Sequence, residues 1–348
     1  MAGTSASSRA ASTSSHPRPD DIGPTRVSRV HAYALDMDLP IGYRLRTPTP
    51  DDLGAVAAVV IADELSDGGQ IVLGADFVRG EWSRVGDLAA DAWVAVDGAG
   101  VIVGYAQITL EEPDVAQSWG VVHPEHRGLG IGTSLLDRIE ERAPELVAAP
   151  HSLRYRHAIN AGDDAAAAML RARGLRPVHH FWHMQIDLVE PVEPGRSPEG
   201  IDIDGIEPDE DLAAIHALLD EAFIDDRSHH PAPFDRWVEE ETSSPSYDPT
   251  LWLLARDGAV PVGVVTASDA EDRGWVDYLA VSASHRGRGI GAALLRRSFA
   301  LFADREIRRV LVSVDAQNPT GATAVYERVG MRIVNRWDQW ERPSATSR

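Results

Sequence analysis

The chain has 348 residues, of which 43% are hydrophobic and 25% are charged, as in a soluble globular protein with room for two domains of ordinary size. A formal net charge of −21 disfavours general nucleic-acid binding but suits a cationic substrate. The absence of cysteine excludes disulfides, thiolate metal sites and a cysteine acyl-enzyme, and it fits a cytoplasmic location. No apolar run approaches the ~18 residues that span a membrane, so we expect no membrane association.

The first part of the chain predicts a tail followed by one domain. Residues 1–40 are rich in Ser, Ala, Thr, Pro and Arg without apolar periodicity, which predicts disorder. Residues 41–188 alternate between strand and helix patterns and form the predicted N-terminal domain. Its expected elements are a strand at 43–46, a helix starting after 47–52, a hairpin of 91–96 and 101–109, a strand at 117–122, a helix, a strand at 153–158, a helix at 163–173 and a strand at 178–188.

The second part repeats this order. Residues 189–200, VEPVEPGRSPEG, are acidic and proline-rich without a core pattern and predict a linker. Residues 201–342 then form the predicted C-terminal domain. Its expected elements are a strand at 201–206, a helix from 208, a long polar connection at 222–249, a hairpin of 251–255 and 260–268, a strand at 275–281, a helix, a strand at 309–314, a helix at 319–329 and a strand at 332–340.

A glycine-rich turn follows the strand that ends at Val281. Its sequence, Arg286-Gly287-Arg288-Gly289-Ile290-Gly291, opens a helix. Glycines let backbone N–H groups approach a ligand, and the helix dipole adds positive potential there, so the turn predicts an anion site and phosphate as its ligand. A dinucleotide site is disfavoured because the turn lies deep inside its domain and no acidic residue follows at the ribose spacing. A turn that merely starts a helix is the structural alternative.

The same turn occurs twice. The segment Arg127-Gly128-Leu129-Gly130-Ile131-Gly132-Thr133 follows a strand ending at Val122, and Arg127 precedes Arg286 by 159 residues. Further on, Gly174 precedes Gly330 by 156 residues. Two landmarks at nearly one offset indicate a duplicated domain.

The R-x-x-G-x-G spacing between strand and helix resembles the acyl-CoA pyrophosphate loop of the GNAT N-acetyltransferase superfamily. The resemblance covers about residues 41–342 and implies a mixed-sheet α/β fold with two tandem GNAT domains, in a layout similar to the mycothiol synthase family of actinobacteria. It implies acetyl-CoA as the co-substrate, with a backbone N–H near Val281 as oxyanion donor. The implied cofactor-binding residues are Leu279, Val281, Arg286, Gly287, Arg288, Gly289, Ile290, Gly291 and Asn318 in the second copy, and Val122, Arg127, Gly128, Leu129, Gly130, Ile131, Gly132 and Thr133 in the first. Asn318, which precedes Pro319, is also a good helix N-cap.

The reaction implied is direct attack of a primary amine on an acetyl thioester in a ternary complex. Tyr326, four residues before Gly330, matches the family's general acid, whereas the first copy has Leu170, which cannot donate a proton. Asp277 lies four residues before Val281, on the same strand face, and is the candidate general base. Counting back from Val122 places Ser118 at the equivalent position in the first copy. Asp277 could instead be a solvated strand carboxylate, and the rival bases are Glu221, Asp225, Asp226 and His229.

We therefore expect the C-terminal domain to acetylate a small-molecule amine. The degenerate N-terminal domain either binds acetyl-CoA or is structural. The alternatives are mycothiol synthase itself and a non-catalytic CoA-binding regulatory protein, acting as a monomer or homodimer. We assign no metal, since His179 and His183 share a strand face about 13 Å apart while His180 faces away.

Overall fold

The computed structural model describes residues 39–66, 73–148, 153–189, 192–224, 231–244, 246–270, 273–317 and 321–342. All of them belong to one compact unit, residues 36–348. The predicted disordered tail at 1–40 therefore lies almost entirely outside the described residues. Asn318 and three of the rival bases, Asp225, Asp226 and His229, also lie outside them.

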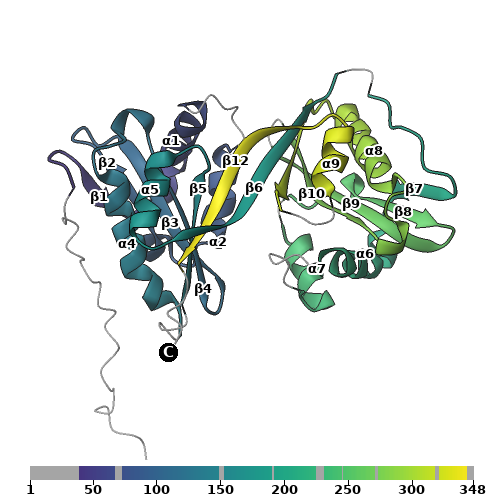
Figure 1. The fold of residues 1–348 in the computed structure, drawn as a ribbon, viewed down its shortest axis with the longest axis horizontal. Coiled ribbons are helices and arrows are strands. Elements are labelled where there is room, and N and C mark those ends of the chain that lie inside the picture. Colours follow the sequence, from purple (N-terminus) through teal and green to yellow (C-terminus); the bar gives the residue numbers. More distant parts are fainter. Residues whose placement is uncertain are drawn as a thin grey trace, which may run out of the picture. The chain divides into compact units, whose positions relative to one another are not determined.

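The described chain is a mixed α/β fold, which confirms the predicted fold class (Figure 1). Its strands form one hydrogen-bonded sheet in the order β1-β2-β3-β4-β5-β12-β6-β11-β10-β9-β8-β7. In the first half of the chain the elements are β1 (Arg44–Arg46), α1 (Leu53–Ser66), α2 (Ala75–Arg84), α3 (Leu88–Asp91), β2 (Ala92–Val96), β3 (Ile102–Glu112), β4 (Val115–Val122), α4 (Ile131–Leu146), β5 (Arg154–Asn160), α5 (Asp164–Ala172) and β6 (Arg176–Asp187).

The second half repeats this order from residue 201. Its elements are β7 (Ile201–Gly205), α6 (Pro208–Phe223), α7 (Phe234–Thr242), β8 (Leu253–Asp257), β9 (Val260–Ala270), β10 (Arg273–Val281), α8 (Ile290–Asp304), β11 (Arg309–Asp315), α9 (Ala322–Arg328) and β12 (Arg332–Arg342). Helix α7 lies within the connection 222–249, for which the sequence predicted no regular element.

Successive side chains of a strand point to opposite faces of the sheet, and in the first half both faces carry a helix-covered core. In β2, Trp93 and Ala95 pack in a core that contains α4 and α5 residues. Val94 and Val96, one position along, pack in a second core with residues of α1 and α2. The second half has its own core, which includes residues of α6, α8 and α9.

The last strands of the two halves are exchanged. Strand β6 pairs antiparallel with β11, from Arg309↔Asp187 to Asp315↔Phe181. Strand β12 pairs antiparallel with β5, and the two exchanged strands also pair with each other. Each half of the sheet is thus completed by a strand from the other half of the sequence. The predicted domains 41–188 and 201–342 instead assign each of these strands to its own half.

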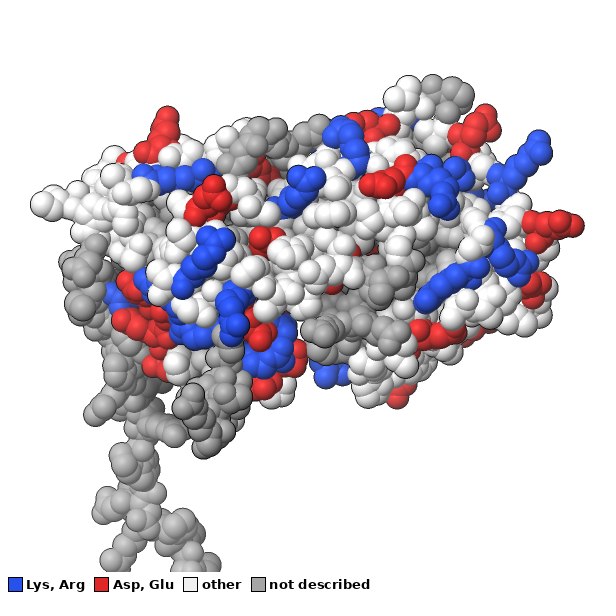
Figure 2. All heavy atoms as spheres, in the orientation of Figure 1, with Lys and Arg blue, Asp and Glu red and all other residues white. Residues whose placement is uncertain are grey.

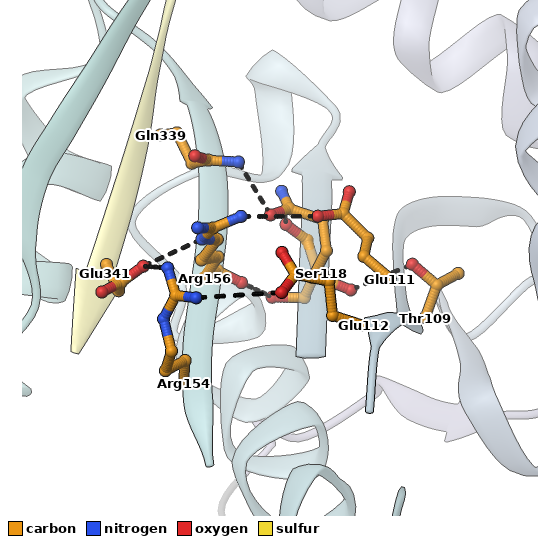
Figure 3. Close-up of polar contacts among 9 residues, drawn as sticks. Thr109, Glu111, Glu112, Ser118, Arg154, Arg156, Gln339 and Glu341 are labelled. Carbon is orange, nitrogen blue, oxygen red and sulfur yellow. Dashed lines mark hydrogen bonds and ion pairs between the residues drawn. The ribbon is translucent and has the colours of Figure 1, made fainter. Parts of the chain in front are cut away.

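Ion pairs and amide hydrogen bonds fasten β12 to the first half (Figure 3). Arg156 Nε and Arg154 Nη2 donate to Glu341 Oε2 over 2.9 and 3.2 Å, and Gln339 Nε2 donates to Gln117 Oε1 over 3.0 Å. Burial opposes ionisation of Glu341, but the two guanidinium groups outweigh burial and hold its pKa below the usual value. Removing one arginine would leave a partly buried charge less well compensated.

Charged side chains of both signs are dispersed over one face of the molecule (Figure 2). Figure 2 shows acidic and basic residues interspersed on the face in view, where they do not form one large patch of either sign. Among the described residues, every helix is too short or too polar to cross a membrane.

Candidate active site

Strand β10 carries a β-bulge at Asp277. Its register with β9 runs regularly from Val281↔Gly263 to Tyr278↔Thr266, and then shifts so that Val276 pairs with Ala267. Asp277 is the extra residue, and the Tyr278 N–H donates to Thr266 Oγ1 over 3.1 Å. A bulge bends its strand and redirects the side chain at that point.

Strands β10 and β11 separate at the same place. They pair in parallel only at Gly274, Trp275 and Val276. From Asp277 to Val281, β10 has no partner on its β11 side in the described chain, so the backbone groups that point away from β9 can bind a ligand.

Because β10 and β11 diverge beyond Val276, they leave a wedge-shaped gap between them, called the wedge below. The glycine turn lies at the open end of this wedge. Gly287 and Gly289 have φ values of 78° and 83°, a backbone conformation that side-chain-bearing residues rarely adopt, and Gly289 caps α8. A Cβ added to Gly291 would lie 3.6 Å from Val325 and 3.7 Å from Leu279 and Val281. The turn, the end of β10 and α9 therefore meet at one point, beside the amide-rich, electropositive end of α8.

A cavity of about 740 Å³ occupies the wedge, and most of the predicted site residues of the second copy line it. Those that line it are Asp277, Leu279, Val281, Arg286, Gly287, Gly289, Ile290, Gly291 and Tyr326. Arg288 does not line it, because its guanidinium pairs with Asp257 at 3.1 Å. Arg286 remains at the cavity, where its Nε donates to the Val281 carbonyl over 3.2 Å.

The Tyr326 side chain belongs both to the core and to the cavity. It is 5% exposed, and burial raises its pKa above the usual value near 10. Its phenol therefore keeps its proton at neutral pH. Helix α9 ends just beyond it, where Gly330, with φ of 98°, allows the chain to turn into β12.

Asp277 is exposed to the cavity and accepts a hydrogen bond of 3.1 Å from Ser268 Oγ. Desolvation by the surrounding walls raises the pKa of Asp277 to about 7, the Ser268 bond opposes this rise, and the charge of Glu241 adds to it. Glu221, a predicted rival base, instead accepts hydrogen bonds from the Ala283 N–H and Ser282 Oγ.

One wall of the cavity was not predicted from the sequence. Helices α6 and α7 contribute Phe223, Trp237, Glu240 and Glu241 to the cavity, and β6 contributes Phe181. The spacing of Phe234, Trp237 and Glu241 by three and four residues is helical and could have indicated α7. No local pattern indicates that Phe181 belongs to a cavity of the other half.

The first half lacks the bulge. Strand β4 pairs with β3 without interruption from Gly104↔Val122 to Leu110↔Ala116, and with β5 from Val115 to Trp119. By this register Ser118 corresponds to Val276, so its predicted correspondence to Asp277 is wrong. The bulge adds one residue and shifts the count. Ser118 is buried, 2.7 Å from His157 Nδ1 and 3.1 Å from the Tyr155 hydroxyl.

The first half nevertheless keeps the glycine turn. Gly128 and Gly130 have φ values of 75° and 85°, close to those of the second copy, and α4 follows. Arg127 pairs with Asp63, and Ile131 is buried. Four further predicted positions keep their places: Val122 ends β4, exposed Leu129 lies in the turn, and Gly132 and Thr133 lie in the first turn of α4.

Aromatic side chains pack beside β4 at the position that corresponds to the cavity of the second half. Trp119, which corresponds to Tyr278 in register, packs against Phe77 and Tyr105 with ring centroids 5.5 and 5.3 Å away. Its indole N–H donates to Glu81 Oε2 over 2.9 Å. Leu170 is fully buried. The first half thus has neither the carboxylate nor the phenol of the second.

Within the described ranges, no cluster of three or more His, Asp or Glu side chains is arranged to hold a metal ion. Of the three neighbouring histidines, His180 lies 2.7 Å from Asp338, and His183 is buried with its ring edge-on to Trp275.

The sequence matches the acetyltransferase (GNAT) family over residues 70–175 and again over 212–331. The chain therefore belongs to this family, as the resemblance predicted, and is an N-acetyltransferase with two GNAT copies.

Its relatives include two proteins named mycothiol acetyltransferase. The one from Cellulomonas flavigena is 31% identical over 69% of this chain and 71% of its own length, and the one from Streptomyces coelicolor is 31% identical over 81% and 89%. A GCN5-related N-acetyltransferase from Sphaerobacter thermophilus has a similar structure, with a TM-score of 0.77 and 32% identity over 88% of this chain and 98% of its own. A tandem GNAT protein from the clavulanic acid biosynthesis pathway shares the fold, with a TM-score of 0.63 and 20% identity over 88% of this chain and all of its own.

Proposed function

We propose that the second half transfers acetyl from acetyl-CoA to a primary amine of a small molecule, with both substrates bound at once. The observation that carries this proposal is that one cavity holds the bulged carboxylate Asp277, the buried phenol Tyr326 and the glycine turn before α8. This convergence disfavours a purely regulatory CoA-binding protein, which would need neither the carboxylate nor the phenol.

The residues fit acetyl-CoA as the donor. The glycine turn and the first turn of α8 offer backbone amides to a diphosphate, with Arg286 beside them. The unpaired edge of β10 near Leu279 and Val281 offers backbone groups to an extended amide chain. Acetyl-CoA supplies the thioester carbonyl and a thiolate leaving group.

Asp277 and Tyr326 carry the two proton transfers. An alkyl amine has a pKa near 10, so only about one molecule in a thousand is neutral at pH 7. Asp277, with a pKa of about 7, accepts a proton from the amine directly or through water. The nitrogen–carbon bond forms as the carbon–sulfur bond breaks, and Tyr326 donates the proton that the sulfur takes up. A backbone N–H near Val281 stabilises the negative charge that develops on the carbonyl oxygen.

The acceptor end of the cavity suits an ammonium group. Glu240, Glu241 and Asp277 line it together with Trp237 and Tyr278. The negative charge of these carboxylates stabilises the bound ammonium group, and the faces of Trp237 and Tyr278 can also contact a cation favourably. Because relatives named mycothiol acetyltransferase are 31% identical to this chain, mycothiol synthesis is the second candidate function.

The first half keeps the glycine turn but not the catalytic pair, so we propose that residues 41–188 bind acetyl-CoA without turnover or serve only as structure. A panel of primary amines, including the acceptor of mycothiol acetyltransferases, mixed with acetyl-CoA and a thiol reagent would test the proposed reaction. We expect amine-dependent thiol release without an acetyl-enzyme burst. Calorimetry that detects no acetyl-CoA binding, or thiol release that no amine accelerates, would overturn the proposal.

A further inference from the structure

We propose that Phe181, from the last strand of the first half, determines acceptor specificity in the cavity of the second half. This inference rests on the proposed function and assigns the residue to the amine rather than to acetyl-CoA. Phe181 lines the cavity although it precedes the second half in sequence, because β6 is exchanged onto β11.

The strand register places Phe181 on the acceptor side of the sheet. Directly paired residues in neighbouring strands point to the same face, and so do residues two positions apart in one strand. Trp275 pairs with Leu311, so these two residues point to the same face. Asp315 lies four positions after Leu311 in β11 and therefore shares that face, as does its partner Phe181. Ser268, which pairs with Trp275, donates to Asp277 on this face.

Phe181 and Asp277 therefore stand on the two diverging arms of the wedge. Asp277 belongs to the β10 arm, and Phe181 flanks the β11 arm. A nitrogen that gives its proton to Asp277 has its carbon skeleton in the space between the arms, where Phe181 offers an apolar ring. The ligand class is thus a primary amine with an apolar surface next to the amine-bearing carbon.

The ring of Phe181 is held in place from behind. It stacks on Trp337 with the ring centroids 4.2 Å apart and the planes 14° from parallel. The two residues are also direct partners in the β6–β12 ladder. They lie 156 residues apart, the same separation as Gly174 and Gly330, so they are equivalent residues that meet where the two halves pair. The exchange of strands thus gives the second-half cavity a wall that its own sequence does not contain.

The test compares Phe181→Ala with the wild-type full chain in steady-state kinetics, using the best amine from the panel. We expect the alanine variant to raise the KM for the amine about tenfold, because lost apolar contact of this size corresponds to about 1.4 kcal/mol. The KM for acetyl-CoA should change less than about twofold. Phe181→Leu, which restores apolar volume, should recover most of the loss.

Val178→Ala is the matched control. Val178 lies on the same strand, is exposed and does not line the cavity, so it reports any general effect of weakening β6. Trp337→Ala keeps Phe181 but removes its support, and should give a smaller rise in the KM for the amine. If wild-type protein turns over and Phe181→Ala leaves that KM unchanged, or raises both KM values equally, this inference alone is wrong. Wild-type protein that acetylates no amine overturns the proposed function and this inference together.

Discussion

The two copies differ most in one strand. Strand β10 has one residue more than β4, Asp277, and that residue is the bulge at which β10 leaves β11. Strand β4 stays paired with β5 for one position further along, up to Trp119, the equivalent of Tyr278. The additional residue thus coincides with an earlier separation of β10 from its parallel neighbour and places a carboxylate there, while the glycine turns that follow keep nearly the same φ values.

The glycine turn is therefore present in this fold with or without the carboxylate and the phenol beside it. In the first half, Trp119 donates a hydrogen bond to Glu81 and packs against Phe77. In the second half, the corresponding region is the cavity that α7 helps to line. The strand that completes the first half is itself fastened by Glu341 to Arg154 and Arg156. Aromatic packing around Trp119 thus occupies the position that corresponds to cavity-lining Tyr278 in the second half.

The largest expected effect comes from removing the phenol of the second copy. Tyr326→Phe should lower kcat by about 10²–10³-fold, since general acids contribute effects of this order, with acetyl-CoA affinity nearly unchanged because the ring remains. Stopped-flow thiol release and calorimetry measure the two quantities. Leu170→Met is the control at the matching position of the first copy. It conserves volume in a fully buried site, so turnover should stay within about twofold. Equal losses in both variants would contradict the division of labour.

Asp277→Asn should give the next largest loss, about 10²-fold in kcat/KM, and should change its pH dependence. Desolvation by the cavity walls raises the pKa of Asp277 to about 7, so the wild-type base is protonated and inactive below that pH. Wild-type kcat/KM should therefore fall tenfold per pH unit on the acid side, and the variant should lose this limb. A variant that keeps the limb would assign the titration to another group. Ser268→Ala, which removes the hydrogen bond opposing the shift, should move the limb to higher pH.

The sequence predicted the glycine turns and the element order because both depend on local chemistry. A positive φ at Gly287 or Gly289 requires glycine, and apolar periodicity follows from one face of a strand or helix being buried. The position of Tyr326 beside the turn was predicted from the resemblance to the GNAT superfamily, and the repeat added that the first copy has Leu170 there.

The bulge and the exchanged strands could not be predicted in this way. A bulge is a shift in register between two strands, and nothing in the residues around Asp277 fixes where its partner strand β9 shifts. Strands β6 and β12 are equivalent in sequence order and both pair antiparallel on two sides, so either could have completed either half. Helix α7 was missed because its surroundings are polar and no fully buried residue marks its face.

A smaller effect should separate the two glycine turns. Gly289→Ala forces a residue with a Cβ into φ of 83° and moves amides away from the diphosphate, so the KM for acetyl-CoA should rise about tenfold. Gly130→Ala makes the same change in the first copy, where φ is 85°, and should leave that KM unaltered.

Calorimetry of the two glycine variants also tests whether the first turn binds. If it does, the wild-type chain takes up two molecules of acetyl-CoA and Gly130→Ala takes up one. If the first half is only structural, both chains take up one. A rise in KM from Gly130→Ala as large as that from Gly289→Ala would contradict the assignment of turnover to the second half.

The smallest expected effect concerns stability, which both halves should lose together in mild acid. Burial lowers the pKa values of His157 in the first half and His183 on the exchanged strand to about 4, below the value near 6.5 expected in an unfolded chain. The unfolded state therefore binds protons first as the pH falls, and stability present above about pH 6.5 declines down to about pH 4. At about pH 6 each histidine should cost about 0.8 kcal/mol relative to about pH 7.5. Denaturant unfolding at the two pH values measures this, and His157→Gln and His183→Gln should each remove about half of the difference. A loss removed entirely by one variant would mean that only that histidine stays neutral in the folded chain.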